Sequence, residues 1–389
     1  MTRSWLARAA GQVASGLDQA FNDFVLGSGE PRLAHAERMA GLELIDRFYN
    51  RAELERDFFA PPSAIEPQLQ RLRRLPAGGE LLELRWASAF EPLWDDAVLQ
   101  TRLLEAAEQV PQSMAPLRAA AQRLSQHGGS FRERYFAVTE NRTVHARWYR
   151  HDGAPRPCAV LLHGYASGAF ALEARVWPVE QLFAAGLDVV LTVLPFHGAR
   201  RDPRRGLRPP AFPVASDLRL SIEGMRQLVL DQRALFDYLR AAGAPALGTM
   251  GMSFGGYASA LLATLEARLQ FAALLVPLAY LEPRSWADTA RSPDLMRELE
   301  RERSALRRAQ RLVSPFTRPS LLPDGRCIAI AGELDRVTGM AQAEALAAHL
   351  HAELHRFEGG HLLQLGRGKA FARVLALLER AGITGQRMR

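Results

Sequence analysis

The sequence is poor in cysteine, with only Cys158 and Cys327 among 389 residues. Each begins an apolar run, so we predict two buried core residues and no disulfide. His351 and His355 are spaced for one helix face, but their segment reads as a strand and no CxxC or HExxH pattern accompanies them. The stretch 366–370 lacks the first glycine and the Ser/Thr of a P-loop. The sequence therefore predicts neither a metal site nor a cofactor.

Long apolar runs are also absent. No run of 18 or more apolar residues occurs, which excludes a membrane-spanning helix of ordinary length. The N-terminal residues carry a charge within their apolar part and are too polar for a secretory signal, so we predict a cytoplasmic protein. With 48% hydrophobic and 23% charged residues, the composition is typical of a globular protein. The length indicates one core domain plus an extra segment.

Lysine is nearly missing, because 48 of the 49 basic residues are arginine and the net charge is +7. The densest arginine cluster follows the predicted strand at 188–194 and comprises Arg200, Arg201, Arg204, Arg205 and Arg208. Arg200 and Arg201 are candidate substrate-binding residues for an anionic group. The alternative, which we favour, is a solvated loop paired with local acids. Nucleic-acid binding is not predicted, because the loop is proline-rich, has few aromatics and matches no recognition motif.

A serine stands between glycines directly after a strand-like run. Gly251, Ser253 and Gly255 fit the G-x-S-x-G elbow, in which a sharp strand-to-helix turn exposes the serine. A short buried strand is predicted at 246–251, and an Ala/Leu-rich helix at 257–269. The order of strand, serine turn and helix predicts that Ser253 is a nucleophile.

A nucleophilic serine needs a histidine to take its proton and a carboxylate to orient that histidine. Asp335 and His361 each follow a predicted strand, in the chain order Ser, Asp, His. Glu333 is an alternative acid in the same turn, and His197 is an alternative histidine. Asp335 and His361 are favoured, the latter by its position near the C-terminus.

An apolar strand ends in His163 and Gly164, where we expect one of the two backbone N–H donors of an oxyanion hole. We assign these donors to Tyr165 and Phe254, the residue after the nucleophile. One such donor contributes about 3 to 4 kcal/mol to transition-state stabilisation. His163 itself is expected to support this turn.

These motifs together resemble the α/β-hydrolase fold superfamily over about residues 131–389. The elbow, with its second glycine and tyrosine, is similar to the dienelactone-hydrolase, acetyl-xylan-esterase and prolyl-oligopeptidase branches. The stretch 194–201 is similar to a little-characterised branch in which its histidine is not required. The resemblance implies an α/β fold: a mainly parallel eight-stranded sheet with helices on both faces, and a helical cap insertion at about 280–318.

The pattern of apolar runs locates the elements of this fold. Helices separate most of the predicted strands, which we expect at 131–138, 143–149, 158–163, 188–194, 246–251, 271–276, 326–331 and 353–357. The cap insertion contains a charged helix at 294–312. The catalytic domain is therefore expected at 131–389.

Residues 1–130 are predicted to form an N-terminal helical segment, with helices at 33–59 and 96–126. An apolar stripe is expected to pack on the protein and comprises Leu6, Val13, Leu17, Phe21 and Phe24. Asp18, Asn22 and Asp23 lie on its polar face, so peripheral membrane contact is not favoured.

The sequence thus predicts a cofactor-independent serine hydrolase that cleaves a small-molecule carboxylic ester. A peptidase or an acyltransferase on the same fold is an alternative. A third hypothesis is a non-catalytic hydrolase-fold protein that binds a partner or an anionic lipid surface. The oligomeric state is not predicted.

Overall fold

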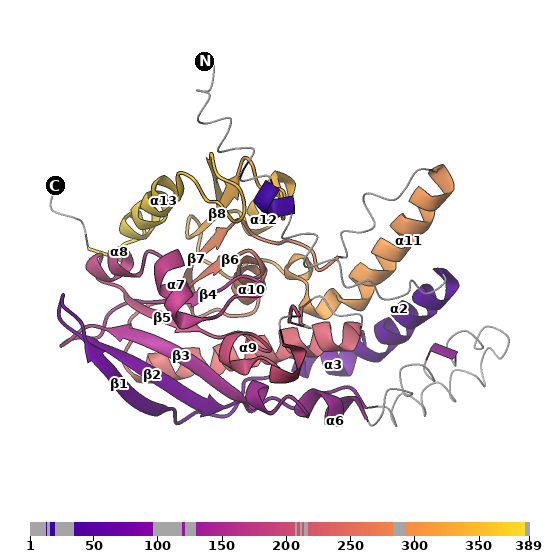
Figure 1. Ribbon diagram of the computed structural model, residues 1–389, viewed down its shortest axis with the longest axis horizontal. Coiled ribbons are helices and arrows are strands. Elements are labelled where there is room, and N and C mark those ends of the chain that lie inside the picture. Colours follow the sequence, from indigo (N-terminus) through magenta and orange to yellow (C-terminus); the bar gives the residue numbers. More distant parts are fainter. Residues whose placement is uncertain are drawn as a thin grey trace, which may run out of the picture.

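A computed structural model of the chain describes residues 13, 16–19, 35–95, 119–120, 130–206, 208–210, 212–213, 217–282 and 292–385. A nine-stranded sheet crosses the molecule in the order β1-β2-β3-β5-β4-β6-β7-β8-β9 (Figure 1). Helices cover both of its faces. The fold class predicted from the sequence is therefore confirmed, with nine strands where eight were expected.

The six strands from β5 to the far edge run parallel. They are β4 (Cys158–Leu162), β5 (Asp188–Thr192), β6 (Leu247–Met252), β7 (Leu269–Leu275), β8 (Cys327–Gly332) and β9 (Glu353–Phe357). Successive side chains point to opposite faces of the sheet, so a strand covered on both faces reads as a continuous apolar run. In β4, Val160 and Leu161 accordingly belong to different core clusters.

The helices form two layers over this parallel region. One layer packs with Leu161 and comprises α7 (Phe170–Val176), α8 (Val179–Ala184) and α13 (Arg367–Arg380). The other comprises α9 (Leu218–Ala241), α10 (Phe254–Ala263) and α12 (Met340–Leu350). Neither of the cysteines, Cys158 and Cys327, is in a disulfide; both are buried.

The opposite edge of the sheet is antiparallel and begins in the N-terminal segment. It consists of β1 (Gln68–Arg74), β2 (Glu80–Ala87) and β3 (Thr143–Arg150). β1 and β2 were not predicted, because residues 1–130 were expected to be helical. The sheet therefore crosses the boundary at residue 130 that the sequence suggested.

The predicted strand at 131–138 is wrong, because α6 (Phe131–Phe136) is a helix. Ser130 caps it: its hydroxyl accepts from the amide of Glu133, while the Glu133 carboxylate accepts from the amide of Ser130. This reciprocal capping box satisfies two N–H groups that a helix start leaves unpaired. Phe131 and Tyr135 are buried on one side of this short helix.

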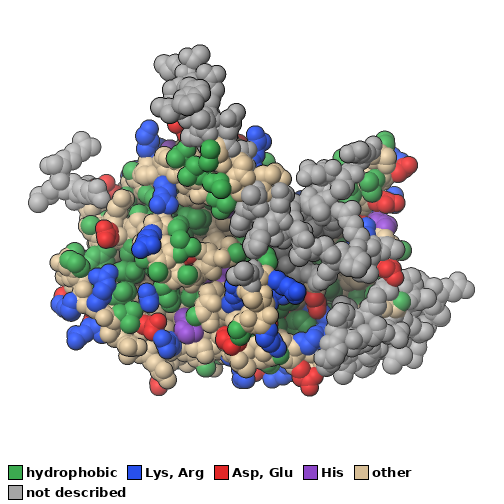
Figure 2. Space-filling model, in the orientation of Figure 1, with side chains coloured by type: hydrophobic (Ala, Val, Ile, Leu, Met, Phe, Trp, Pro, Cys, Tyr) green, Lys and Arg blue, Asp and Glu red, His purple; other side chains and the backbone are tan. Residues whose placement is uncertain are grey.

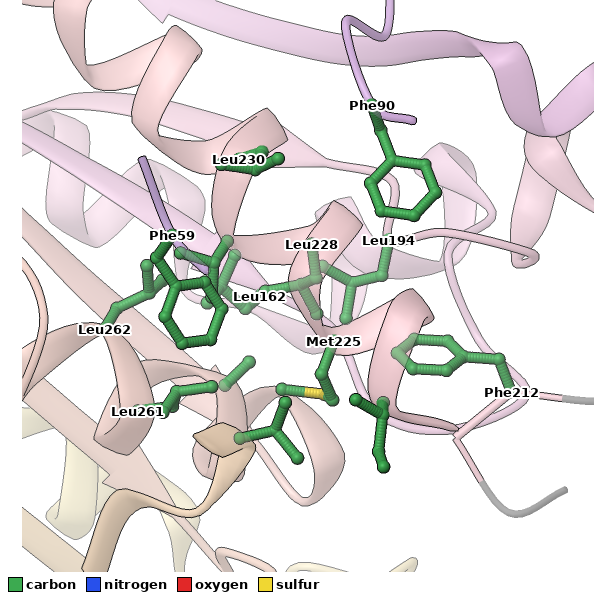
Figure 3. Close-up of a cluster of buried hydrophobic side chains, with 14 of the residues drawn as sticks. Phe59, Phe90, Leu162, Leu194, Phe212, Met225, Leu228, Leu230, Leu261 and Leu262 are labelled. Atoms are coloured by element: carbon green, nitrogen blue, oxygen red, sulfur yellow. The ribbon is translucent and has the colours of Figure 1, made fainter. Parts of the chain in front are cut away.

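The predicted helix at 33–59 is two helices, α2 (His35–Tyr49) and α3 (Ala52–Asp57). Aromatic side chains that follow these helices enter the main core. Figure 3 shows Phe59 and Phe90 beside Leu228 and Leu230 of α9 and Leu162 of β4. The N-terminal segment is thus part of the same core as the parallel sheet. The predicted helix at 96–126 lies outside the described residues, apart from 119–120.

The cap insertion contains α11 (Pro293–Ala309), which lies against α2. Figure 1 shows both helices extending beyond the sheet. Glu302 of α11 is buried and receives hydrogen bonds from Arg38, with its Oε1 also 2.5 Å from Nδ1 of His35. Burial raises the pKa of Glu302, but these two partners outweigh it and lower that pKa. The ion pairs therefore join the cap insertion to the N-terminal segment.

The described N-terminal residues, 13 and 16–19, face the opposite way from the sequence prediction. Val13 and Leu17 were expected to pack on the protein but are 57% and 45% exposed. Asp18 was expected on the polar face but is completely buried. The remaining stripe residues, Leu6, Phe21 and Phe24, lie outside the described residues.

The surface visible in Figure 2 carries interspersed basic and acidic side chains. Many of the arginines are in ion pairs with nearby carboxylates, for example Arg204 with Asp202 and Arg356 with Glu344. Such exposed pairs contribute little to stability, about 0 to 1 kcal/mol each. Among the described residues, no helix combines the length and apolar character needed to cross a membrane.

Candidate active site

Ser253 lies at the junction between β6 and α10, as the elbow motif predicts. Its backbone has φ 55° and ψ −113°, a conformation that residues with a side chain rarely adopt. The amide of Ser253 donates to Leu275 O of β7 at 2.9 Å, and its carbonyl accepts from Leu278 at 3.0 Å. The neighbouring strand therefore holds the strained turn and presents the serine at the carboxyl end of the sheet.

The glycines around the serine are required by close packing. A Cβ on Gly255 would overlap the carbonyl oxygen of Leu162, and one on Gly251 would overlap the carbonyl of Gly255. A Cβ on Gly256 would lie 2.7 Å from Cβ of Pro277. The turn fits between β4 and β7 only with glycine at these positions, which explains the glycine spacing in the sequence.

The structure brings Ser253, His361 and Asp335 into one chain of contacts. Nε2 of His361 lies 2.9 Å from Oγ of Ser253, and its Nδ1 lies 3.0 Å from Oδ2 of Asp335. His361 is 6% exposed and Asp335 is 8% exposed, so water screens their contact weakly. A proton on Nδ1, held by Asp335, leaves Nε2 able to accept the hydroxyl proton of Ser253.

The loop after β8 satisfies the Asp335 carboxylate. Oδ1 accepts from the amides of Val337 at 2.7 Å and Thr338 at 2.9 Å, and Oδ2 accepts from the Thr338 hydroxyl at 2.7 Å. Burial raises the pKa of Asp335, but the hydrogen bonds from His361 and Thr338 outweigh it and lower that pKa to about 2. Asp335 is therefore charged at neutral pH.

The two alternative residues lie elsewhere. The side chain of Glu333 is exposed, and the acid that contacts His361 is Asp335. His197 is completely buried, with Nδ1 2.8 Å from Pro195 O. Burial and the neighbouring His163 lower the pKa of His197 to about 3, so its ring is neutral. The structure brings His361, and not His197, to Ser253.

The loop after β4 passes directly beside the serine. A Cβ on Gly164 would lie 3.5 Å from Cβ of Ser253. His163 is buried beneath this loop, where its Nε2 accepts from the amide of Leu194 at 3.0 Å and its Nδ1 lies 2.7 Å from Gly164 O. Burial lowers the pKa of His163, so a neutral ring supports the turn.

The predicted oxyanion donors belong to two turns, the loop after β4 and the serine turn before α10. Tyr165 follows Gly164, and Phe254 is the first residue of α10, where backbone N–H groups have no acceptor within the helix. The carboxylate of Glu173 fixes the first turn by accepting from the hydroxyl of Ser167 and, at 3.0 Å, from the amide of Gly168. The oxyanion assignment of these two amides stays a prediction.

Arg200 and Arg201 of the arginine cluster bind other groups of the protein. Arg200 is completely buried, with an ion pair to Asp231 at 2.8 Å and a hydrogen bond to Asn141 O at 2.9 Å. Arg201 donates to the carbonyls of Gly206 and Arg208. A substrate cannot reach the Arg200 guanidinium without opening the core, so the expectation that Arg200 binds substrate is corrected. The favoured alternative, a solvated loop paired with local acids, fits Arg204, which pairs with Asp202, but not the buried Arg200.

A cavity of about 130 Å³ lies under the arginine-rich loop. Its walls include Tyr135, Phe196 and Arg205, and its lining does not include the three candidate residues Ser253, Asp335 and His361. In the part of the chain that the structure describes, no group of three or more His, Cys, Asp or Glu side chains is arranged to hold a metal ion.

Three side chains that sequence reasoning missed support the site. Thr338 binds Asp335, as described above. Gln364 donates from Nε2 to His361 O at 3.0 Å, and so supports the histidine loop. Asp18 accepts from the amide of His361 at 3.0 Å. A polar residue three positions after the acid or the histidine was a readable signal, but no sequence signal connects Asp18 to a loop some 340 residues away.

Sequence comparison finds relatives that carry no assigned function. No family model matches the chain. Two curated proteins from two strains of Mycobacterium tuberculosis, both described as uncharacterized, are 32% identical over 259 residues, or 64% of this chain and 60% of theirs. The matched region thus spans about three fifths of the length of these relatives.

Two solved structures match nearly the whole chain. Acetyl xylan esterase 1 of Thermoanaerobacterium is 14% identical, with a TM-score of 0.50 over 92% of this chain and 98% of that one. An acetyl xylan esterase of Paenibacillus is 13% identical, with a TM-score of 0.50 over 85% and 93%. The strand order, the serine turn between β6 and α10, and the match to these two structures all indicate the same fold. The protein therefore has the α/β-hydrolase fold.

Proposed function

We propose that the protein is a serine hydrolase that cleaves a carboxylic ester. His361 accepts the hydroxyl proton of Ser253 as Oγ attacks the acyl carbonyl. The amides of Tyr165 and Phe254 stabilise the oxyanion, and Asp335 keeps the Nδ1 proton on His361. His361 then protonates the leaving alcohol, and a water molecule that it deprotonates releases the acid from the acyl-enzyme.

The observation that carries this proposal is the contact chain of 2.9 Å and 3.0 Å through His361. Ser253 sits at a strained turn, and Gly164 of the oxyanion loop lies against it. Two proteins with a similar fold are named acetyl xylan esterases. Acetyl esters are therefore the first substrates to test, and a small-molecule ester is the proposed substrate class.

The experiment is to label the protein with a fluorophosphonate probe and to assay p-nitrophenyl esters of increasing acyl length. Ser253→Ala should abolish labelling and lower kcat by at least about 10³-fold, because no other group supplies the nucleophile. Ser63→Ala is the matched control, since Ser63 is an exposed serine outside the site. Equal labelling of both variants would contradict the proposal. The chain-length optimum would measure the acyl pocket.

The same assay separates a hydrolase from an acyltransferase. A small alcohol added to the reaction competes with water for the acyl-enzyme. A hydrolase releases mainly the free acid at low alcohol concentration, whereas a transferase releases mainly the new ester. Product analysis by mass spectrometry distinguishes these outcomes. If the folded wild-type protein is neither labelled nor active, the binding-protein hypothesis replaces the enzyme.

A further inference from the structure

A carboxylate from the N-terminal segment reaches the triad. Oδ2 of Asp18 accepts hydrogen bonds from the amides of Arg336 and His361, each at 3.0 Å. Its Oδ1 accepts from the amide of Leu362, also at 3.0 Å. Asp18 is completely buried, and Figure 1 shows the short indigo helix that carries it near α12. One side chain therefore receives three backbone N–H groups from two separate loops.

These loops are the ones that carry the acid and the histidine. Arg336 directly follows Asp335, and the second loop donates from His361 itself. The loops also contact each other before the catalytic residues, where the amide of Leu334 donates to Gly359 O at 3.1 Å. Asp18 adds a contact on the other side of Asp335 and at His361. Its three hydrogen bonds therefore span the two loops that carry Asp335 and His361.

Hydrogen bonds to a buried carboxylate make this contact, and not general apolar packing. A buried carboxylate is costly unless hydrogen bonds satisfy it, and the three N–H groups meet that need with both oxygens in use. The neighbouring apolar residue Leu17 is 45% exposed and contributes little burial. Among the described residues of this segment, 13 and 16–19, Asp18 and not an apolar side chain makes the buried contact at the site.

We propose that Asp18 is a positioning residue of the triad, which holds the acid loop and the histidine loop in register and thereby controls the reactivity of Ser253. The proposal deepens the proposed function and rests on it only for the ester-hydrolysis readout. A misplacement of about 1 Å in a catalytic group lowers the rate by about 10²-fold. The loss of Asp18 should therefore reduce the catalytic rate without changing how the substrate binds.

The first test compares Asp18→Ala and Asp18→Asn with wild type, and uses Asp57→Asn as the matched control at an exposed aspartate. Asp18→Ala should lower kcat for p-nitrophenyl acetate, and the rate of fluorophosphonate labelling, by about 10- to 100-fold. KM should change by less than about 2-fold, because Asp18 does not contact substrate. Asp18→Asn should show a smaller loss, since its amide oxygen still accepts one of the hydrogen bonds.

The second test is independent of activity. In a Ser253→Ala background, amide hydrogen exchange in peptides covering 334–338 and 359–364 should be faster with Asp18→Ala than without it. Exchange in peptides from β6 should not change. Faster exchange with unchanged kcat and labelling would overturn the positioning role. Unchanged exchange would overturn the contact itself, whatever the activity.

Folding is monitored by circular dichroism and thermal unfolding. If Asp18→Ala fails to fold, the isosteric Asp18→Asn variant decides, because a reduced kcat with unchanged KM in a folded protein supports the proposal and an unchanged kcat overturns it. If the wild-type protein neither labels nor hydrolyses esters, the proposed function fails. The exchange experiment still determines whether Asp18 holds the two loops.

Discussion

Two buried carboxylates, Asp335 and Asp231, lie in different regions of the protein and have pKa values shifted in opposite directions. Burial raises the pKa of both. At Asp335, His361 and Thr338 outweigh burial and lower the pKa to about 2. At Asp231, the ion pair with Arg200 and the hydrogen bond from Ser88 do not outweigh it, and the pKa is raised.

The difference shows what each region does with a buried charge. Asp335 accepts hydrogen bonds from two backbone amides and one hydroxyl, so its charge is held beside His361. Asp231 lies in α9 and joins Arg200 to Ser88, which follows β2 of the antiparallel edge. The first carboxylate lies beside His361 at the carboxyl end of the sheet. The second holds a loop and an edge of the sheet together.

The largest expected effect comes from a substitution that tests the role of Asp335. Asp335→Asn should lower kcat by about 10⁴-fold, because an amide can hold the wrong tautomer of His361 while the geometry stays intact. Glu333→Gln is the matched control, since Glu333 lies in the same turn and its side chain is exposed. Ester hydrolysis at neutral pH measures both variants. Similar losses in both would contradict the assignment of Asp335.

A second prediction tests the structural role of Asp231. Asp231→Ala should lower the free energy of unfolding by about 3 to 5 kcal/mol, because it leaves the Arg200 guanidinium buried without its carboxylate. Asp237→Ala on the same helix removes an ion pair with Arg268 whose side chains are 43% and 33% exposed. That control should cost less than about 1 kcal/mol. Urea denaturation measures both, and equal losses would refute the structural role of Asp231.

A third prediction concerns the effect of pH on stability through His197, a buried group that is neutral in the folded protein. Its pKa is lowered to about 3 in the folded protein, against about 6.5 unfolded. The unfolded chain therefore binds this proton first, and stability falls as the pH drops from about 6.5 to about 3. Between pH 7 and pH 5 the loss from this group is about 2 kcal/mol.

His197→Gln removes this titration, so its free energy of unfolding should fall about 2 kcal/mol less than that of wild type between pH 7 and pH 5. His163 is shifted in the same direction and remains in the variant, so part of the pH dependence persists. Urea denaturation at the two pH values gives the comparison. An identical pH dependence in both proteins would show that His197 is not held neutral.

The smallest expected effect concerns Leu17, beside the buried Asp18. Leu17→Gln should change the free energy of unfolding by no more than about 0.5 kcal/mol, because the side chain is already half exposed. Thermal unfolding measures the change. A large destabilisation would restore the sequence prediction that the apolar stripe packs on the protein.

The parallel half of the sheet could be predicted closely. Strands such as β4 and β8 are buried on both faces, and therefore appear in the sequence as short apolar runs between turn residues. The three candidate catalytic residues could be predicted from the same positions, because the carboxyl ends of parallel strands meet at one edge. Ser253, Asp335 and His361 accordingly stood out as polar residues directly after three of these runs.

The antiparallel edge could not be predicted in the same way. Gln68–Arg74 is exposed along its whole length, so it shows no apolar pattern. The S-x-x-E signal at Ser130 and Glu133 was present in the sequence and marks the start of a helix where a strand was predicted. The burial of Asp18 could not be foreseen, because its partners are backbone amides, and these carry no side-chain signature in the sequence.

The edge strand β1 has a consequence for behaviour at high concentration. An open strand edge invites pairing with another molecule, which leads to aggregation. β1 lies at the end of the sheet in Figure 1, carries Arg71, Arg73 and Arg74, and contains a bulge between Arg71 and Arg73. Positive charge and an interrupted hydrogen-bond register both oppose the docking of a foreign strand. The exposed edge of the sheet is thereby protected against growth into a fibril.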